Sequence, residues 1–86
     1  MSEMTLAMTA AERLKRIVID VLLIEDAEYR DDYGPSEIAN WDSLATVTLA
    51  TAIEREFGLH VPSDEMAFFN CIGDIRQFCR SSGLDV

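Results

Sequence analysis

The sequence is short of basic residues. It has 7 Lys and Arg against 16 Asp and Glu, which gives a formal net charge of −9. Binding to nucleic acid requires a basic surface, and anionic membranes attract basic segments, so the composition argues against both partners. The acidic excess instead favours partner proteins with basic docking patches, because opposite charges speed up reversible encounters.

The residues that build common catalytic and metal sites are also scarce. His60 is the only histidine, and it has no companion group in the sequence for general-base catalysis. No spacing of His, Cys and Asp matches a zinc site, and Gly34 and Gly58 belong to no phosphate-binding loop. The acids within 25–42 lack the glycine and terminal Glu of a calcium loop. We therefore expect no metal site and no enzymatic activity of the chain's own.

Long apolar runs are absent and cysteines are few. No window approaches the length of a membrane span, and residues 1–8 lack the features of a signal peptide. Cys71 and Cys79, if both lie on one helix, are about 12 Å apart along its axis, which is too far for a disulfide. The sequence therefore predicts a cytoplasmic, monomeric protein with two free thiols.

Helical periodicity dominates the rest of the chain. Thr9 and Glu12 form a capping box ahead of an apolar repeat that predicts a helix over 10–24. Further helices are predicted over 43–57, which Gly58 ends, in a short segment after Pro62, and from 70 or 71 to about 82. The 86 residues fit one domain, 1–86, with flexible ends at 1–8 and 82–86. We predict an all-α, small four-helix bundle with a long loop between helices 1 and 2 and a short third helix.

The predicted loop over 25–42 is acidic and is broken by Gly34-Pro35. A connection of this length in a small domain suggests an ordered functional loop. Four apolar residues are expected to anchor it: Tyr29, Tyr33, Ile38 and Trp41. Because its acids repel one another, added salt or magnesium is expected to raise the melting temperature.

Ser43 lies where this loop meets the second helix, in Trp41-Asp42-Ser43-Leu44. A hydroxyl at a helix N-terminus is exposed and is placed where a phosphate is electrostatically favoured. Asp and Ser are also ordinary N-cap residues, so capping alone would explain the tripeptide. Leu44 and Val47 fall outside the apolar face of the helix and are predicted to form an exposed contact patch for partners.

Three more fragments follow Asp42-Ser43-Leu44 in a set order: Glu54-Arg55-Glu56-Phe57-Gly58, Val61-Pro62 and Phe69-Asn70-Cys71-Ile72-Gly73-Asp74-Ile75. Each fragment alone is common. In this order and spacing, on an acidic four-helix pattern, the chain from about Leu14 to Phe78 resembles the acyl carrier protein family.

The resemblance implies that Ser43 carries 4′-phosphopantetheine, attached from coenzyme A by a separate phosphopantetheinyl transferase, with Asp42 and Leu44 completing the attachment motif. The terminal thiol of this group would hold acyl intermediates as thioesters. The implied partners are acyl-loading, condensing or acyl-transferring enzymes with basic patches, which would contact Leu44, Val47, Glu54 and Glu56. Apolar residues of the interior could also shelter part of an acyl chain.

The chain departs from the typical fatty-acid carrier at several positions. Ala45 and Thr48 stand where that pattern has acids, and Arg55 interrupts an acidic triplet. Cys71 replaces a Ser or Thr that often caps the last helix, which leaves Asn70 to cap it. We therefore expect a carrier for a specialised pathway that makes a polyketide, a hybrid peptide product, or a modified lipid or saccharide.

Two alternatives stay open from the sequence. A peptidyl carrier of nonribosomal peptide synthesis would share the fold and the serine, but the residues directly before that serine are usually different, and the protein is usually less acidic. An unmodified helical adaptor would use Ser43 only as a cap, and Leu44 with Val47 as its binding face.

Overall fold

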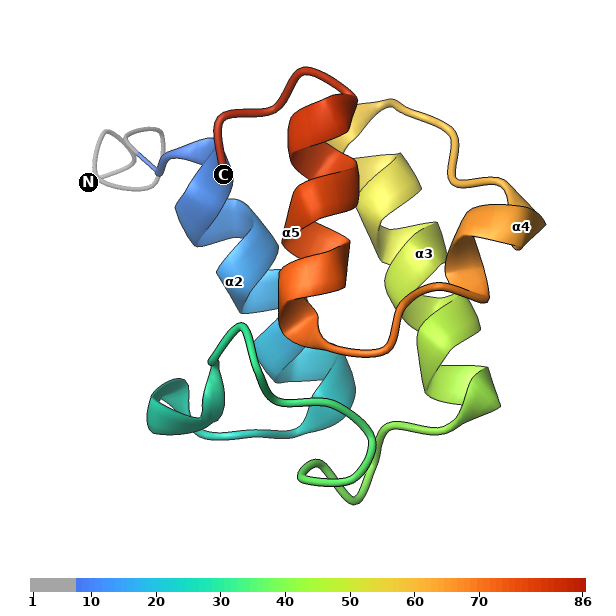
Figure 1. Ribbon diagram of the computed structural model, residues 1–86. Helices are drawn as coiled ribbons and strands as arrows, with labels where there is room; N and C mark the ends of the chain where they lie inside the picture. Colours follow the sequence, from blue (N-terminus) through green and yellow to red (C-terminus); the bar gives the residue numbers. More distant parts are fainter. Residues whose placement is uncertain (1–7) are drawn as a thin grey trace.

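The computed structural model describes residues 8–86, which form a bundle of four helices (Figure 1). The helices are α2 (Ala10–Leu22), α3 (Ser43–Phe57), α4 (Ser63–Met66) and α5 (Ile72–Ser81), and a single 3-10 turn, η1 (Asp26–Glu28), lies in the long loop. Residues 8–86 contain no strand. The predicted all-α bundle, with its long first loop and its short third helix, is confirmed.

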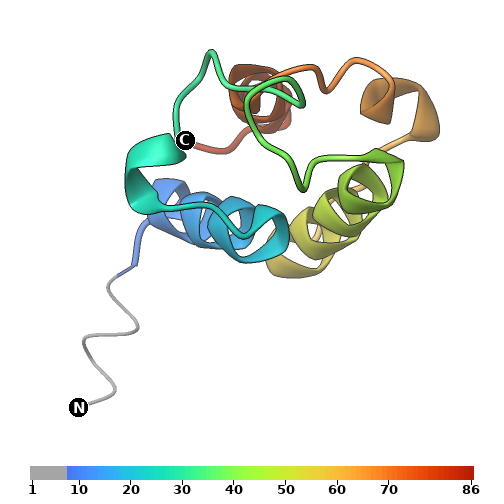
Figure 2. The same ribbon diagram turned by 90° about the horizontal axis from the view of Figure 1, so that it is seen from below.

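The core lies where α5 packs over α2 and α3. Figure 1 shows α5 in front of the other two helices, and Figure 2, seen from below, shows α2 and α3 side by side beneath it. Each helix contributes apolar side chains spaced three or four residues apart, so one face of each helix is buried. The fully buried ones include Leu14, Val18, Leu22, Leu49, Ile53, Ile72, Ile75 and Cys79. Burial of this apolar surface is the main force that holds the bundle together.

The long loop closes the lower end of the bundle in Figure 1. Ile38 and Trp41 are 2% and 4% exposed, and Tyr29 and Tyr33 pack half-buried against the same core. The prediction that these four residues anchor the loop is confirmed.

Backbone carbonyls of the loop cap the N-terminus of α5. The N–H of Ile72 donates to the carbonyl oxygen of Tyr33, and the N–H of Gly73 donates to that of Asp31, both at 2.9 Å. The first N–H groups of a helix have no partner inside the helix, so these bonds satisfy groups that a side chain would otherwise cap. The N-cap residue is Cys71, whose side chain makes no capping bond.

The prediction that the side chain of Asn70 caps this helix is therefore wrong. The loop carbonyls already occupy the capping positions, and the backbone N–H of Asn70 instead donates to a carboxylate oxygen of Asp74 at 2.9 Å. The sequence gives no sign of this arrangement because the capping groups lie far away along the chain.

Two glycines allow the loop to come this close. A Cβ atom on Gly34 would lie 2.2 Å from the carbonyl oxygen of Asn70, and one on Gly73 would lie 3.0 Å from that of Asp31. The first distance is far inside van der Waals contact, so only glycine fits at position 34 without movement of the backbone.

Helix α3 has the predicted bounds, but α2 ends at Leu22, two residues before the predicted end at residue 24. Gly58 ends α3 in the left-handed backbone region, with φ 66°. Leu23 does the same for α2, with φ 56°, and its N–H donates to the carbonyl oxygen of Ile19. This turn directs the chain away from the helix axis, which is why α2 cannot continue to residue 24.

The two chain ends differ in how much is described. Residues 1–7 lie outside the described range, so most of the predicted flexible N-terminal segment does too. At the other end, Leu84 and Val86 pack against the core, and the Arg76 guanidinium donates to the carbonyl oxygen of Val86 at 2.8 Å. The flexibility of residues 82–86 stays a prediction. None of the helices in 8–86 has the length and apolar character needed to cross a membrane.

Candidate functional site

Ser43 is the first residue of α3, and its side chain is exposed. The N-cap of the helix is Asp42, whose carboxylate oxygen Oδ1 accepts a hydrogen bond from the N–H of Ala45 at 2.9 Å. The carbonyl oxygen of Asp42 also accepts the first helical bond, from the N–H of Thr46 at 3.0 Å. Asp42 therefore caps the helix, so capping does not explain the presence of the serine next to Asp42.

Polar groups at Ser43 are free to bind a ligand. Within residues 8–86, the Ser43 hydroxyl and the backbone N–H groups of Ser43 and Leu44 make no hydrogen bond. Unpaired N–H groups at a helix N-terminus, together with the helix dipole, favour a phosphate. The residues present thus fit a phosphodiester on the Ser43 oxygen.

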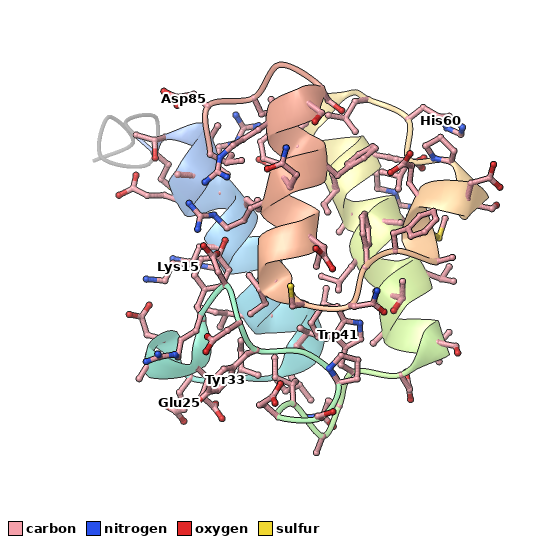
Figure 3. The ribbon with its side chains drawn as sticks, viewed as in Figure 1. Lys15, Glu25, Tyr33, Trp41, His60 and Asp85 are labelled. Atoms are coloured by element: carbon pink, nitrogen blue, oxygen red, sulfur yellow. The ribbon has the colours of Figure 1, made fainter. Side chains whose placement is uncertain are left out.

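Trp41 fixes this end of α3 to the core. Its indole is 4% exposed and its Nε1–H donates to the hydroxyl oxygen of Thr46 at 2.9 Å. The Thr46 hydroxyl in turn donates to the carbonyl oxygen of Asp42 at 3.2 Å. In Figure 3, Trp41 lies inside the lower end of the bundle, where the loop meets α3. The serine side chain is therefore exposed, while hydrogen bonds of the residues before and after it hold the backbone in place.

The sequence alone did not identify Thr46 or its hydrogen bonds. The tryptophan five residues before a threonine at a helix start is the one signal that could have suggested them.

Two of the predicted partner-binding residues lie next to Ser43. Leu44 is 74% exposed and Val47 is 50% exposed, which confirms the prediction that both side chains face solvent. Exposed side chains of this size, close to each other on one helix, form a small apolar surface beside the serine. Their contact with a partner stays a prediction.

The other two predicted partner-binding residues lie at the opposite end of α3. Glu54 is about 15 Å along the helix from Leu44. Its carboxylate oxygen Oε2 accepts a hydrogen bond from the N–H of Val61 at 2.7 Å and lies 3.2 Å from Nδ1 of His60. The carboxylate of Glu56 pairs with the Arg13 guanidinium at 2.6 Å. Both carboxylates thus already have partners within the chain.

The remaining candidate reactive groups lie away from Ser43. Figure 3 shows His60 at the upper end of the molecule and Trp41 at the lower end. Cys79 is buried in the core, and burial raises the pKa of its thiol to about 11. Cys71 and Cys79 are both free thiols, as predicted. The part of the chain from 8 to 86 holds no group of three or more His, Cys, Asp or Glu side chains that could bind a metal.

Comparison with known proteins identifies the family of the chain. The family model described as a phosphopantetheine attachment site matches residues 12–79. The chain belongs to the acyl carrier protein family. Proteins of this family are carriers and not catalysts, and they hold 4′-phosphopantetheine covalently. When attached, that group supplies the thiol on which an acyl chain is held as a thioester.

Curated relatives agree with the family. An acyl carrier protein of Sinorhizobium fredii (strain NBRC 101917 / NGR234) is 40% identical over 74 residues, which cover 79% of this chain and 87% of the relative. The acyl carrier protein AcpP of Rhizobium meliloti (strain 1021) is similar to the same extent. The predicted family and cofactor are confirmed.

Proposed function

We propose that Ser43 is the residue to which 4′-phosphopantetheine is attached. The observation that carries this proposal is an exposed hydroxyl without a hydrogen-bond partner at the start of a long helix that Asp42 already caps. Thr9, the hydroxyl residue at the start of α2, differs because its oxygen accepts a hydrogen bond from the N–H of Glu12 at 3.1 Å. The features that a transferase needs, access and a free hydroxyl, thus meet at Ser43.

In the proposed function each residue around Ser43 has a defined part. The N–H groups of Ser43 and Leu44 would hold the phosphate. Asp42 and Trp41 keep the helix end in place, so that the arm leaves the protein from a fixed point. Leu44 and Val47 offer apolar contact to each enzyme in turn. Because this surface is small, binding is weak and the carrier can leave for the next enzyme.

Intact-protein mass spectrometry tests the attachment site. Wild type, Ser43→Ala and Ser36→Ala would be incubated with coenzyme A, magnesium and a broad-specificity phosphopantetheinyl transferase. Ser36 is the matched control because it is an exposed serine in the loop that precedes the same helix. We expect wild type and Ser36→Ala to gain one phosphopantetheine and Ser43→Ala to gain none. Loading of Ser43→Ala would refute the proposal.

We further propose that this carrier serves a specialised pathway rather than general fatty acid synthesis. The exposed surface of α3 carries little negative charge: Thr48 is exposed and uncharged, and Arg55 is an exposed cation among the acids, whereas Ala45 is buried in the core. Glu54 and Glu56 are each paired with another group of the chain, which further reduces the negative charge that α3 offers to a partner. A basic docking patch would therefore find less negative charge on this helix than the typical fatty-acid carrier offers.

Elongation in a reconstituted general fatty acid synthase tests the pathway. The loaded protein is expected to be elongated much more slowly than a carrier taken from that system. Thr48→Glu restores an exposed acid on α3 and is expected to raise the rate, whereas Thr51→Glu, three residues further from Ser43, serves as the control. Elongation of the wild type at the rate of the native carrier would refute this part of the proposal. Loading with an amino acid by an adenylation enzyme would favour the peptidyl carrier instead.

A further inference from the structure

Leu23 combines two unfavourable features. Its backbone lies in the left-handed region, with φ 56°, and its side chain is 74% exposed. A residue with a Cβ atom is disfavoured in this region, and an exposed leucine gains nothing from burial. At the corresponding position after α3 the chain has Gly58, which adopts φ 66° without strain. Glycine at position 23 would therefore make the isolated protein more stable.

The Leu23 side chain lines a shallow surface hollow of about 520 Å³ between the end of α2 and the start of α3. Leu44 and Ala45 form part of its apolar wall, and two exposed acids, Asp20 and Asp42, lie on it as well. The end of α2 and the start of α3 both lie at the lower end of the molecule in Figure 1. We call this feature the Leu23 hollow.

A hydrogen bond fixes the two sides of the Leu23 hollow to each other. The side-chain amide of Asn40 donates to the carbonyl oxygen of Leu22 at 3.2 Å. Asn40 lies two residues before the cap of α3, and Leu22 is the last residue of α2. The position of Leu23 relative to the helix that begins at Ser43 is therefore set by the fold.

We propose that the Leu23 hollow is a docking surface for the phosphopantetheinyl transferase, and that it binds an apolar side chain of that enzyme with basic residues at its rim. The proposal rests on Ser43 as the attachment residue. The transferase must bring its reacting groups to the Ser43 oxygen itself, and the residues on either side of Ser43, Asp42 and Leu44, line the hollow. Enzymes that act later meet the thiol at the far end of the arm, so they can contact Leu44 without reaching Leu23.

Charge supports this occupant. Asp20 and Asp42 are exposed, and the chain as a whole has a formal charge of −9, so a partner with Lys or Arg around an apolar anchor fits the Leu23 hollow. A second copy of this acidic chain would be repelled from the same surface.

Leu23→Gly separates docking from stability. The melting temperature is expected to rise by a few degrees because glycine removes the backbone strain. The kcat/KM of the transferase for the protein, with coenzyme A saturating, is expected to fall about tenfold, the usual effect of losing one apolar anchor from an interface. Since the variant is expected to be more stable, unfolding cannot account for such a loss.

Two further variants serve as controls. Leu23→Met keeps an apolar side chain and is expected to load within about twofold of wild type. Phe68→Ala removes a side chain that is 67% exposed but does not line the Leu23 hollow, and it is expected to load like wild type. Asp20→Asn is expected to lower kcat/KM at low salt and to make it less dependent on salt.

The outcomes distinguish this proposal from the proposed function. If wild type is loaded on Ser43 and Leu23→Gly is loaded with the same kcat/KM, the docking proposal alone is refuted. A fall in kcat/KM for Phe68→Ala as large as that for Leu23→Gly also refutes the docking proposal. If wild type is not loaded on Ser43 at all, both proposals fail together.

Discussion

Replacement of Asp42 by alanine is expected to lower stability, whereas replacement of Ser43 by alanine is expected to abolish loading with little effect on stability. Asp42→Ala removes the 2.9 Å hydrogen bond from the N–H of Ala45 and leaves that group without its cap. Loss of an N-cap costs about 1 kcal/mol, and in a domain of this size about 1 kcal/mol lowers the melting temperature by roughly 4–8 °C. Asp42→Ala should therefore melt lower by this amount.

Ser43→Ala should leave the melting temperature almost unchanged. The Ser43 hydroxyl makes no hydrogen bond within residues 8–86, and alanine is at least as good a helix former as serine. The free energy of unfolding should thus change by less than about 0.5 kcal/mol. The same substitution is expected to abolish loading with phosphopantetheine.

Thermal unfolding followed by circular dichroism measures both effects on the protein before loading. Asp42→Asn is the control, because asparagine caps a helix about as well as aspartate does, and it should melt close to wild type. If Ser43→Ala melts as low as Asp42→Ala, Ser43 has a structural role that the hydrogen bonds do not account for. An unchanged melting temperature for Asp42→Ala would refute the assignment of the cap.

Three further predictions concern the loop and the core. Gly34→Ala should lower the melting temperature by roughly 10 °C or more, because its Cβ would lie 2.2 Å from the carbonyl oxygen of Asn70 and must displace the loop; an unchanged transition would contradict this contact. Stability should fall as the pH rises from about 9 toward 11, because the buried Cys79 thiol, whose pKa is raised to about 11, keeps a proton that the unfolded chain has lost. The melting temperature of Cys79→Val should depend less on pH in this alkaline range. Added salt should raise the melting temperature only slightly, because loop carboxylates are already paired; Asp31, for example, lies 2.5 Å from the Arg76 guanidinium. Arg76→Ala should therefore increase the effect of salt on the melting temperature.

Local signals explain the parts of the fold that the sequence predicts well. The bounds of α3 follow from an aspartate that caps one end and from Gly58, which adopts the left-handed conformation at the other. The capping box of Thr9 and Glu12 marks the start of α2 in the same way. The attachment motif is local too, so Ser43 could be proposed before its geometry was known.

Contacts between distant segments explain what the sequence could not predict. The cap of α5 comes from carbonyl oxygens of Asp31 and Tyr33, which no pattern around Cys71 reveals. The pairing of Glu56 with Arg13 likewise joins two helices. The left-handed backbone of Leu23 has no signal of its own, because an apolar residue at that place is equally consistent with another turn of helix.

The measurement that tests the central claim most directly is tandem mass spectrometry of the loaded protein after digestion with trypsin. The peptide over 31–55 contains both Ser36 and Ser43, and its fragments separate the two positions. The account predicts that the mass of one phosphopantetheine appears only in fragments that contain Ser43. Its appearance on Ser36, or on any other residue, would contradict the account.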